Sequence, residues 1–327
     1  MSYNVKTGVY KVYAIDGKSI KYNITNAITG LEISESDGEI AKRVNISVFN
    51  VKLSDGAYLS SKLALMSYIL IYAGGDEVYR GVVWEWEFKE TTDNECNIAS
   101  YDLAIYLQKS KDNSYYSSGK MTADIVKDIC KRWNVKVNYN YGSIQHGKLS
   151  YKNIAISEHI IRTLDDAKAH FKVPYILNTN KDTICINQRG TNTDVYTFDD
   201  TKSLISFTHK TSLNGLITKI QIVAKKEDDE RTTVEYEMTG KTQYGYLQEI
   251  ITRDNNTTLE DAKKEAQALF DEKGSPIEKI VVEAPDIPNM HKGDRFRIKA
   301  ATGELLLYVV SISHDGVNGT MSIDAEK

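Results

Sequence analysis

The stretch "ASYDLAIYLQKSKDNSYYSSG" (residues 99–119) decides how the chain divides, because it separates two regions of different texture. It follows strand-like sequence, yet Leu103, Tyr106 and Leu107 recur at the i, i+3, i+4 spacing of a short helix with one apolar side. Ser100 or Asp102 can cap that helix. The stretch therefore predicts a domain junction at which the apolar side of the helix packs against a first β domain, with Leu107 buried.

A catalytic interpretation of this stretch competes with the structural one. Asp102 is close in sequence to Tyr101 and Tyr106, and such groups can handle protons in an active site. Catalysis would also need a base, a nucleophile or a second acid at a spacing that suggests cooperation, and the stretch supplies none. We therefore predict a structural joint.

Length, charge and cysteine usage narrow the functions further. With 327 residues and 41% hydrophobic residues, the chain is long enough for two or three compact domains. The longest apolar run, residues 68–73, is far shorter than the roughly 20 residues that span a bilayer, and no signal-peptide pattern is visible. Cys96, Cys130 and Cys185 are odd in number and widely spaced, which favours a reducing compartment. A net charge of -4 gives no general attraction to nucleic acid. We expect cytoplasmic assembly, no membrane insertion and no specific nucleic-acid partner.

The pattern along the chain predicts an α+β, mainly β protein with three domains. Residues 1–108 read as a first tube-like β-barrel domain, residues 109–201 as an α+β insert domain, and residues 202–327 as a second tube-like β-barrel domain with one helix. Thr122 and Ser157 are the expected caps of two helices in the insert, and Thr258 is the expected cap of the helix in the last domain.

The two β regions resemble each other. "ILIYAGGDEVYRGVVW" (Ile69–Trp84) and "FRIKAATGELLLYVVS" (Phe296–Ser311) align without a gap and match Ile71 with Ile298, Ala73 with Ala300, Glu77 with Glu304, Val82 with Val309 and Val83 with Val310. Any two hairpins share β-forming residues and a glycine-containing turn, so chance similarity stays open beside duplication. If the domain is duplicated, three chains can present six equivalent barrels around one axis, with a rotation near 60° between the two barrels of a chain.

The order of segments resembles the XkdQ-type, late-control-protein-D-like baseplate hub proteins of contractile phage tails and phage-tail-like particles. The resemblance is carried by "GLEISESDGEIAKRVNISVFN", "ASYDLAIYLQKS" followed by "GKMTADIVKDIC", and "LEDAKKEAQALFDEKG" followed by "HKGDRFRI". It implies a homotrimeric structural protein without a catalytic centre of its own. It also implies contacts with a tail tube protein, a trimeric spike protein and other baseplate proteins.

The segment "VVWEWEFKE" supplies the first part of a candidate partner surface. Strand alternation places Trp84, Trp86 and Phe88 on one side and Glu85, Glu87 and Lys89 on the other. Two acids at i, i+2 cannot flank one glycosidic bond, so a glycosidase would need a further carboxylate from elsewhere. The histidines show no metal-binding spacing, and no nucleotide-binding or hydrolase motif occurs. We therefore predict no catalytic, metal or cofactor site.

The charged segment "AKKEDDERTT" (residues 224–233) reads as a solvated hairpin tip or as an electrostatic contact with a neighbouring protein. We take Trp84, Glu85, Glu87, Lys225, Lys226 and Asp228 as candidates for a ring or partner interface. Two functions stay open. The first is a structural baseplate hub that adapts a six-fold tail tube to a trimeric spike. The second is a glycan-binding module or peptidoglycan hydrolase of the tail tip, whose 21 tyrosines would stack on sugars.

Overall fold

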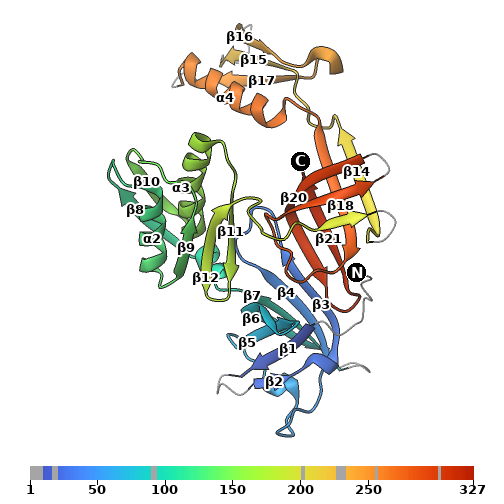
Figure 1. Ribbon diagram of the computed structural model, residues 1–327. Coiled ribbons are helices and arrows are strands. Elements are labelled where there is room, and N and C mark those ends of the chain that lie inside the picture. Colours follow the sequence, from blue (N-terminus) through green and yellow to red (C-terminus); the bar gives the residue numbers. More distant parts are fainter. Residues whose placement is uncertain are drawn as a thin grey trace. The chain divides into compact units, whose positions relative to one another are not determined.

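The computed structural model describes residues 10–16, 21–89, 94–199, 203–225, 233–254, 257–300 and 303–327. The chain divides into two compact units: a large unit up to residue 207 and from residue 281 onward, and a small unit of residues 208–280. Strands dominate, as the sequence predicts (Figure 1). The predicted boundaries at residues 108/109 and 201/202 stay predictions, and each unit is described by itself below.

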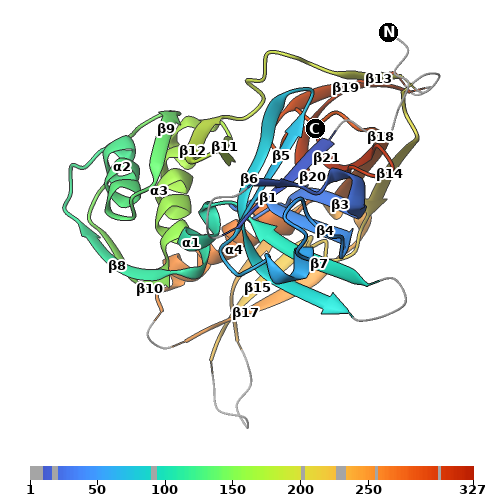
Figure 2. The same cartoon turned by 90° about the horizontal axis from the view of Figure 1, so that it is seen from below.

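The first half of the large unit consists of strands β1 to β7. Their bounds, with two short 3-10 helices, are β1 (Tyr10–Ile15), β2 (Lys21–Asn23), η1 (Thr25–Ala27), β3 (Ile28–Glu35), β4 (Arg43–Phe49), η2 (Leu59–Ser61), β5 (Tyr68–Ala73), β6 (Asp76–Lys89) and β7 (Glu95–Tyr101). On β4 the alternate residues Val44, Ile46 and Val48 are all buried, which is the period of a strand with one face in a core. Figure 2 shows these strands, in blue and cyan, grouped around one region.

The insert follows with helices and short strands. Its elements are α1 (Ala104–Lys109), β8 (Lys111–Tyr116), α2 (Thr122–Arg132), β9 (Lys136–Asn140), β10 (Leu149–Ala155), α3 (Ile156–Phe171), β11 (Tyr175–Asn180) and β12 (Thr183–Gln188). The expectation that Thr122 and Ser157 are N-caps is wrong. Both lie inside their helices and are buried. Thr122 Oγ1 donates to Ile144 O instead, so a tertiary contact uses the hydroxyl that a cap would need.

The second half of the large unit contains β13 (Thr197–Asp199), β14 (Ser206–Ser212), β18 (Ile277–Pro285), β19 (Arg295–Ala300), β20 (Gly303–Asp315) and β21 (Thr320–Glu326), of which β14 and β18 run on into the small unit. The small unit also contains β15 (Lys219–Ala224), β16 (Val234–Thr239), η3 (Thr242–Tyr244), β17 (Gln248–Arg253) and α4 (Leu259–Lys273). Its sheet has the order β16-β15-β17, and α4 packs on it through Ala262 and Ala266. Thr258 is the N-cap of α4, as predicted, because its Oγ1 accepts from Asp261 N at 3.2 Å.

The two halves have the same strand order. In the first half the strands neighbour one another as β1-β5-β6-β7-β4-β3, and in the second half as β13-β19-β20-β21-β18-β14. The strands of the two series also follow one another in the same order along the chain. By this correspondence β5 matches β19 and β3 matches β14. Two differences remain. β2 pairs with β1 at the end of the first series and has no counterpart among the described strands of the second, and β1 pairs antiparallel with β5 whereas β13 pairs parallel with β19.

Matching irregularities strengthen the correspondence. The register of β6 with β7 shifts between Val83 and Glu85, and the register of β20 with β21 shifts between Val309 and Ser311. Bulges at the same place in two independent hairpins are specific features, since each one re-aims the strand that follows. The observations favour duplication over chance similarity of two hairpins.

The hairpin register corrects one part of the sequence alignment. Both hairpins have the same pairs at the turn, Tyr72 with Glu77 in the first and Lys299 with Glu304 in the second. In the first hairpin the pairing register shifts by one residue between Tyr72 and Ile71, and in the second hairpin the register is continuous. As a result the structural counterpart of Val309 is Val83, and the ungapped matches of Val82 with Val309 and of Val83 with Val310 are wrong by one position.

Candidate assembly surface

The two halves join through one antiparallel strand pair, which we call the seam. It consists of Glu32–Glu35 at the end of β3 and Ile312–Asp315 at the end of β20, with Ile312 opposite Glu35 and Asp315 opposite Glu32. Through this pair the strands of both halves belong to one continuous sheet. The seam therefore fixes how one half is positioned against the other within a chain.

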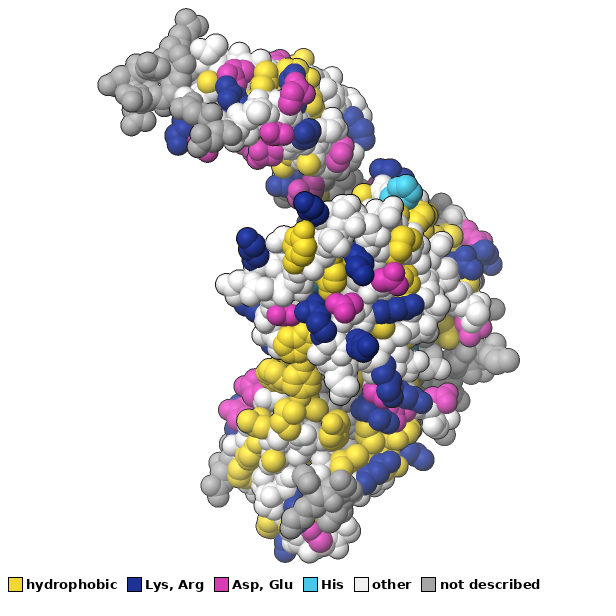
Figure 3. Space-filling model, turned by 90° about the vertical axis from the view of Figure 1, so that its left-hand side faces the viewer, with side chains coloured by type: hydrophobic (Ala, Val, Ile, Leu, Met, Phe, Trp, Pro, Cys, Tyr) yellow, Lys and Arg dark blue, Asp and Glu magenta, His cyan; other side chains and the backbone are white. Residues whose placement is uncertain are grey.

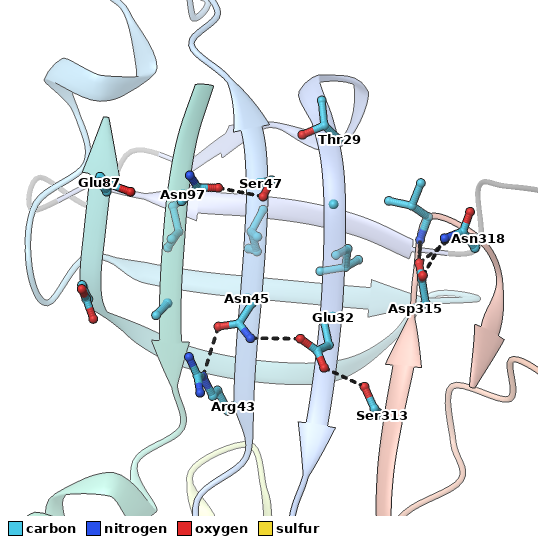
Figure 4. Close-up of a pocket in the computed structure, with 17 residues that line it drawn as sticks. Thr29, Glu32, Arg43, Asn45, Ser47, Glu87, Asn97, Ser313, Asp315 and Asn318 are labelled. Carbon is cyan, nitrogen blue, oxygen red and sulfur yellow. Dashed lines mark hydrogen bonds between the residues drawn. The ribbon is translucent and has the colours of Figure 1, made fainter. Parts of the chain in front are cut away.

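One face of the sheet at the seam is polar. Glu32 accepts hydrogen bonds from Asn45 Nδ2 at 3.1 Å and from Ser313 Oγ at 3.0 Å, so its carboxylate links β4, β3 and β20 across the seam (Figure 4). Arg43 Nε donates to Asn45 Oδ1 at 3.1 Å. Such cross-strand pairs stabilise a register, and they leave a hydrated surface rather than a dry cavity.

This polar face forms a shallow groove that also contains Glu85 and Glu87 of β6. Its described lining residues include no His, Cys or Lys that could activate a nucleophile. Ser47 Oγ donates to Asn97 Oδ1 at 2.7 Å. Burial would raise the pKa of Asp315, but hydrogen bonds from Asn318 and Val317 lower it below its usual range. The groove offers hydrogen bonding and negative charge.

Behind the seam lies a buried ionic cluster. Glu35 Oε1 is 2.9 Å from both Lys42 Nζ and His291 Nδ1, and the side chains of Glu35 and Lys42 are only 5% and 7% exposed. Burial would raise the pKa of Glu35, but Lys42 and His291 hold it well below its usual range. Lys292 Nζ donates to the carbonyl oxygens of Ser36, at 2.9 Å, and of Glu39. The second half thus contacts the end of β3 through His291 and the β3–β4 loop through Lys292.

A second buried contact between the halves was not foreseen from the sequence. His314 Nδ1 is 2.6 Å from Asp286 Oδ1, and Tyr10 OH donates to Asp286 Oδ2 at 2.7 Å. Tyr10 is 276 residues from Asp286 in the chain, so no local pattern indicates the pairing. Burial, and then the carboxylate of Asp286, raise the pKa of Tyr10. All three side chains are buried and serve as internal hydrogen-bonding groups.

The predicted junction residues on α1 belong to a core that the insert and the first half share. Leu107 is fully buried, as expected, in a core that contains Ile125 and Ile156 of the insert together with Ile40 and Ala41 of the β3–β4 loop of the first half. Tyr106 packs against the same core and also contacts β6, with its ring centroid 6.0 Å from that of Trp84. Leu103 is half-buried at the start of α1. Helix α1 is therefore held by contacts with the insert and with the first half.

Asp102, rather than Ser100, supports the start of this helix. Asp102 Oδ1 accepts from Ala104 N at 2.9 Å, and Oδ2 accepts from Lys42 N at 3.0 Å and from Thr179 Oγ1. Ser100 Oγ instead lies 2.8 Å from the hydroxyl of Tyr79. Burial raises the pKa of Asp102 to about 6, although these hydrogen bonds act in the opposite direction. One carboxylate thus ties the first half, α1 and β11 together.

The candidate interface residues on β6 do not all lie as alternation predicts. Trp86 and Phe88 pack against the core of the first half, while Glu85 and Glu87 are exposed in the polar groove. Trp84 lies at the bulge and points to Tyr101 and Tyr106 instead, with 37% of its surface exposed. The expectation that Trp84 shares a side with Trp86 and Phe88 is therefore wrong, because the bulge shifts the alternation.

The remaining candidates lie in or beside the small unit. Lys225 Nζ is 3.3 Å from Asp254 Oδ1 on the surface of that unit. Lys226 and Asp228 lie outside the described residues. In the described part of the chain, no group of His, Cys, Asp or Glu side chains is arranged to hold a metal ion. None of its helices has the length and apolar character that a membrane crossing requires.

A further exposed surface is apolar. Figure 3 shows hydrophobic side chains gathered in the lower half of the face that it displays. In the first half, Leu65, Met66 and Tyr68 are 61%, 54% and 49% exposed. They precede or begin β5 and lie near α1, since Tyr106 OH contacts Met66 Sδ at 3.2 Å. Apolar groups exposed together are typical of contacts with other proteins.

Comparison with known proteins identifies the family. The family model described as YQBQ-like matches residues 37–326. The chain belongs to the YQBQ-like family. A curated relative, the YqbQ protein of Bacillus subtilis (strain 168), is 23% identical over 258 residues, which cover 77% of this chain and 74% of the relative. The family match runs from the β3–β4 loop through the insert to the end of β21.

Solved structures show that this YQBQ-like chain shares the fold of tail proteins. The 43 kDa tail protein of prophage MuSo2 from Shewanella oneidensis is 14% identical and superposes with a TM-score of 0.70, over 96% of this chain and 97% of that one. The tail protein from Neisseria meningitidis MC58 is 11% identical, with a TM-score of 0.66 over 97% and 95% of the two chains. The resemblance to tail hub proteins, first indicated by the order of sequence segments, is thereby confirmed at the level of family and fold.

Proposed function

We propose that this protein is the structural baseplate hub of a contractile phage tail or of a phage-tail-like particle. In this proposal each half is a tube-like β-barrel, three chains form a homotrimer, and six barrels surround a central axis. The observation that carries the proposal is the strand order that occurs twice in one chain, with a bulge at the same place. Membership in the YQBQ-like family and the shared fold of tail proteins support it.

The repeated and unrepeated parts suit two different symmetries. Every chain contains two halves with the same strand order. A closed ring of three identical chains therefore contains six such halves around its axis. The insert and the small unit occur once in a chain and therefore three times in the ring. One side of the ring could thus contact a six-fold tail tube, while three-fold features contact a trimeric spike and other baseplate proteins. The role is that of a symmetry adapter.

The proposed role requires no chemistry. The polar groove at the seam provides hydrogen bonds and carboxylates on an open sheet face, which suits a hydrated channel wall or a protein contact. We propose that the protein is not an enzyme, needs no cofactor, assembles in the bacterial host cytoplasm and becomes part of the particle's baseplate.

The mass of the purified full chain tests the trimer. A chain of 36.9 kDa should give a species of about 111 kDa by light scattering, alone or after addition of the spike protein of the same particle. Electron microscopy of that species should show a ring with six lobes. A monomer under both conditions, or a ring with another number of lobes, would contradict the proposal.

Sedimentation with purified bacterial cell wall separates the alternative function. The hub should stay in the supernatant and release no soluble peptidoglycan fragments. The matched control is Glu85→Gln/Glu87→Gln, which removes both exposed β6 carboxylates of the groove. Cell-wall cleavage by the wild-type chain that this variant loses would favour the hydrolase, and retention on the cell wall without cleavage would favour a glycan-binding module.

A further inference from the structure

The end of β6 has an open backbone edge where its counterpart does not. In the second half, Ile312–Asp315 of β20 has β21 on one side and β3 on the other. When the two strands are aligned at their bulges, the counterpart of this segment is Trp86–Lys89 of β6. That segment pairs with β7 on one side, and among the described residues no strand pairs with its other side. The first half therefore contains a counterpart of the β20 side of the seam, without a strand paired to it in the position that β3 occupies beside β20.

The second half shows the missing strand. β14 corresponds to β3, the strand that makes the seam inside the chain. It stands at the end of the sheet beside β18, and no described strand pairs with its outer edge (Figure 1). Open edges are templates for pairing with another chain, and proteins generally cover them. One chain thus ends in two complementary edges, β6 in the first half and β14 in the second.

We propose that β14 of one copy pairs antiparallel with Trp86–Lys89 of a second copy and so repeats the β3–β20 seam between chains. The inference rests on the proposed homotrimer and names the surface that closes it. A ring of six halves then contains three seams within chains and three between chains, and no edge of this kind stays open. The partner is a second copy of this chain.

Charge at the two edges favours this occupant. Glu85, Glu87 and Lys89 are exposed on β6, with Lys89 Nζ 3.3 Å from Glu87 Oε2, so these three side chains leave one net negative charge, and Lys210 is exposed on β14. Within the chain, the polar face beside the seam is likewise joined by side chains, because Ser313 Oγ donates to Glu32. Opposite charges opposite one another on neighbouring strands stabilise pairing, whereas like charges oppose it. The candidate residues Glu85 and Glu87 acquire a defined role in the contact.

Backbone geometry allows a selective test. Ile205 N donates to Glu283 O on β18, so in the alternation of an antiparallel ladder the amides of Thr208 and Lys210 point to the outer edge. Proline has no amide hydrogen and is tolerated on the solvent side of an edge strand. Thr208→Pro/Lys210→Pro should therefore remove outward donors and leave the bonds to β18. Thr208→Ala/Lys210→Ala is the matched control, because it shortens the same side chains and keeps both donors.

Light scattering of the full chain should give the trimer mass for the wild type and a monomer of 36.9 kDa for the proline variant at the same concentration. The alanine control should stay mainly trimeric. A proline variant that stays trimeric overturns the pairing while the proposed hub stands. A wild-type chain that never forms a trimer instead contradicts the proposed function itself.

Carbodiimide cross-linking gives a readout that does not depend on how the variants fold. In wild-type trimers, mass spectrometry should find Lys210 joined to Glu85 or Glu87 of another copy, and Lys210→Arg should remove that product. Mixing isotopically labelled and unlabelled chains before assembly shows whether the two peptides come from different copies. Trimers that yield inter-chain products only at other sites overturn the proposed pairing.

Discussion

At the scale of single residues, the most informative side chain is Asp102. It lies in the stretch that indicates the junction, and the residue is 2% exposed in the folded chain. Two backbone amides and the hydroxyl of Thr179 donate to it, yet burial still raises its pKa to about 6. A position that reads as a helix cap is thus also a titrating group at the meeting point of three segments, because the fold brings residues 42 and 179 to it.

The raised pKa of Asp102 predicts a pH-dependent stability. The unfolded carboxyl has a pKa near 3.8 and the folded one a pKa of about 6, so the folded state holds the proton more tightly. Stability from this group should fall as pH rises through that window, by about 2 to 3 kcal/mol in total. Asp102→Asn removes the titration. Urea denaturation at pH 4 and pH 7 should therefore show the stability advantage of wild type over the variant shrinking by that amount. A pH-independent difference would contradict the predicted titration.

At the scale of secondary structure, local pattern predicts pairs of neighbouring strands and misses contacts between distant ones. The β5–β6 and β19–β20 hairpins were predicted correctly, because β-forming residues flank short glycine-containing turns. The helix that starts after Thr258 was predicted correctly for a similar reason, since its cap is local. The seam joins residues about 280 positions apart, and a bulge adds a residue without a sequence signal that distinguishes it. Strand order and side-chain alternation therefore needed the structure.

The short helix α1 tests whether a predicted joint is really packed. With six residues it is too short to be stable by itself, so tertiary contacts must hold it. Leu107→Ala leaves a cavity among Ile125 and Ile156, and it should lower the free energy of unfolding by about 2 to 4 kcal/mol. Leu65→Ala, at a leucine that is 61% exposed, is the control and should cost less than about 0.5 kcal/mol. Equal effects of the two substitutions in chemical denaturation would show that α1 is not held by its core.

At the scale of the whole molecule, the correspondence of the halves explains where additional segments are inserted. β3 and β4 are connected by residues 36–42, whereas their counterparts β14 and β18 are connected by residues 213–276. That long connection contains the core of the small unit, with Ile220, Ile222 and Ala266, and none of the residues in this core belongs to the large unit. The small unit therefore has the character of a domain inserted at the tip of a hairpin, a place where insertions are tolerated.

This interpretation predicts that the small unit can be removed without loss of the ring. Replacing residues 213–276 by a short Gly-Ser linker keeps β14 and β18 and restores a hairpin like that of β3 and β4. The exchange removes a self-contained core and shortens a connection, so it should change the stability of the large unit by less than about 1 kcal/mol, or about 4 °C in its melting temperature. Calorimetry and light scattering of the shortened chain measure both properties. A shortened chain that folds but stays monomeric would assign ring closure to the small unit, and one that aggregates would show that β14 and β18 depend on it.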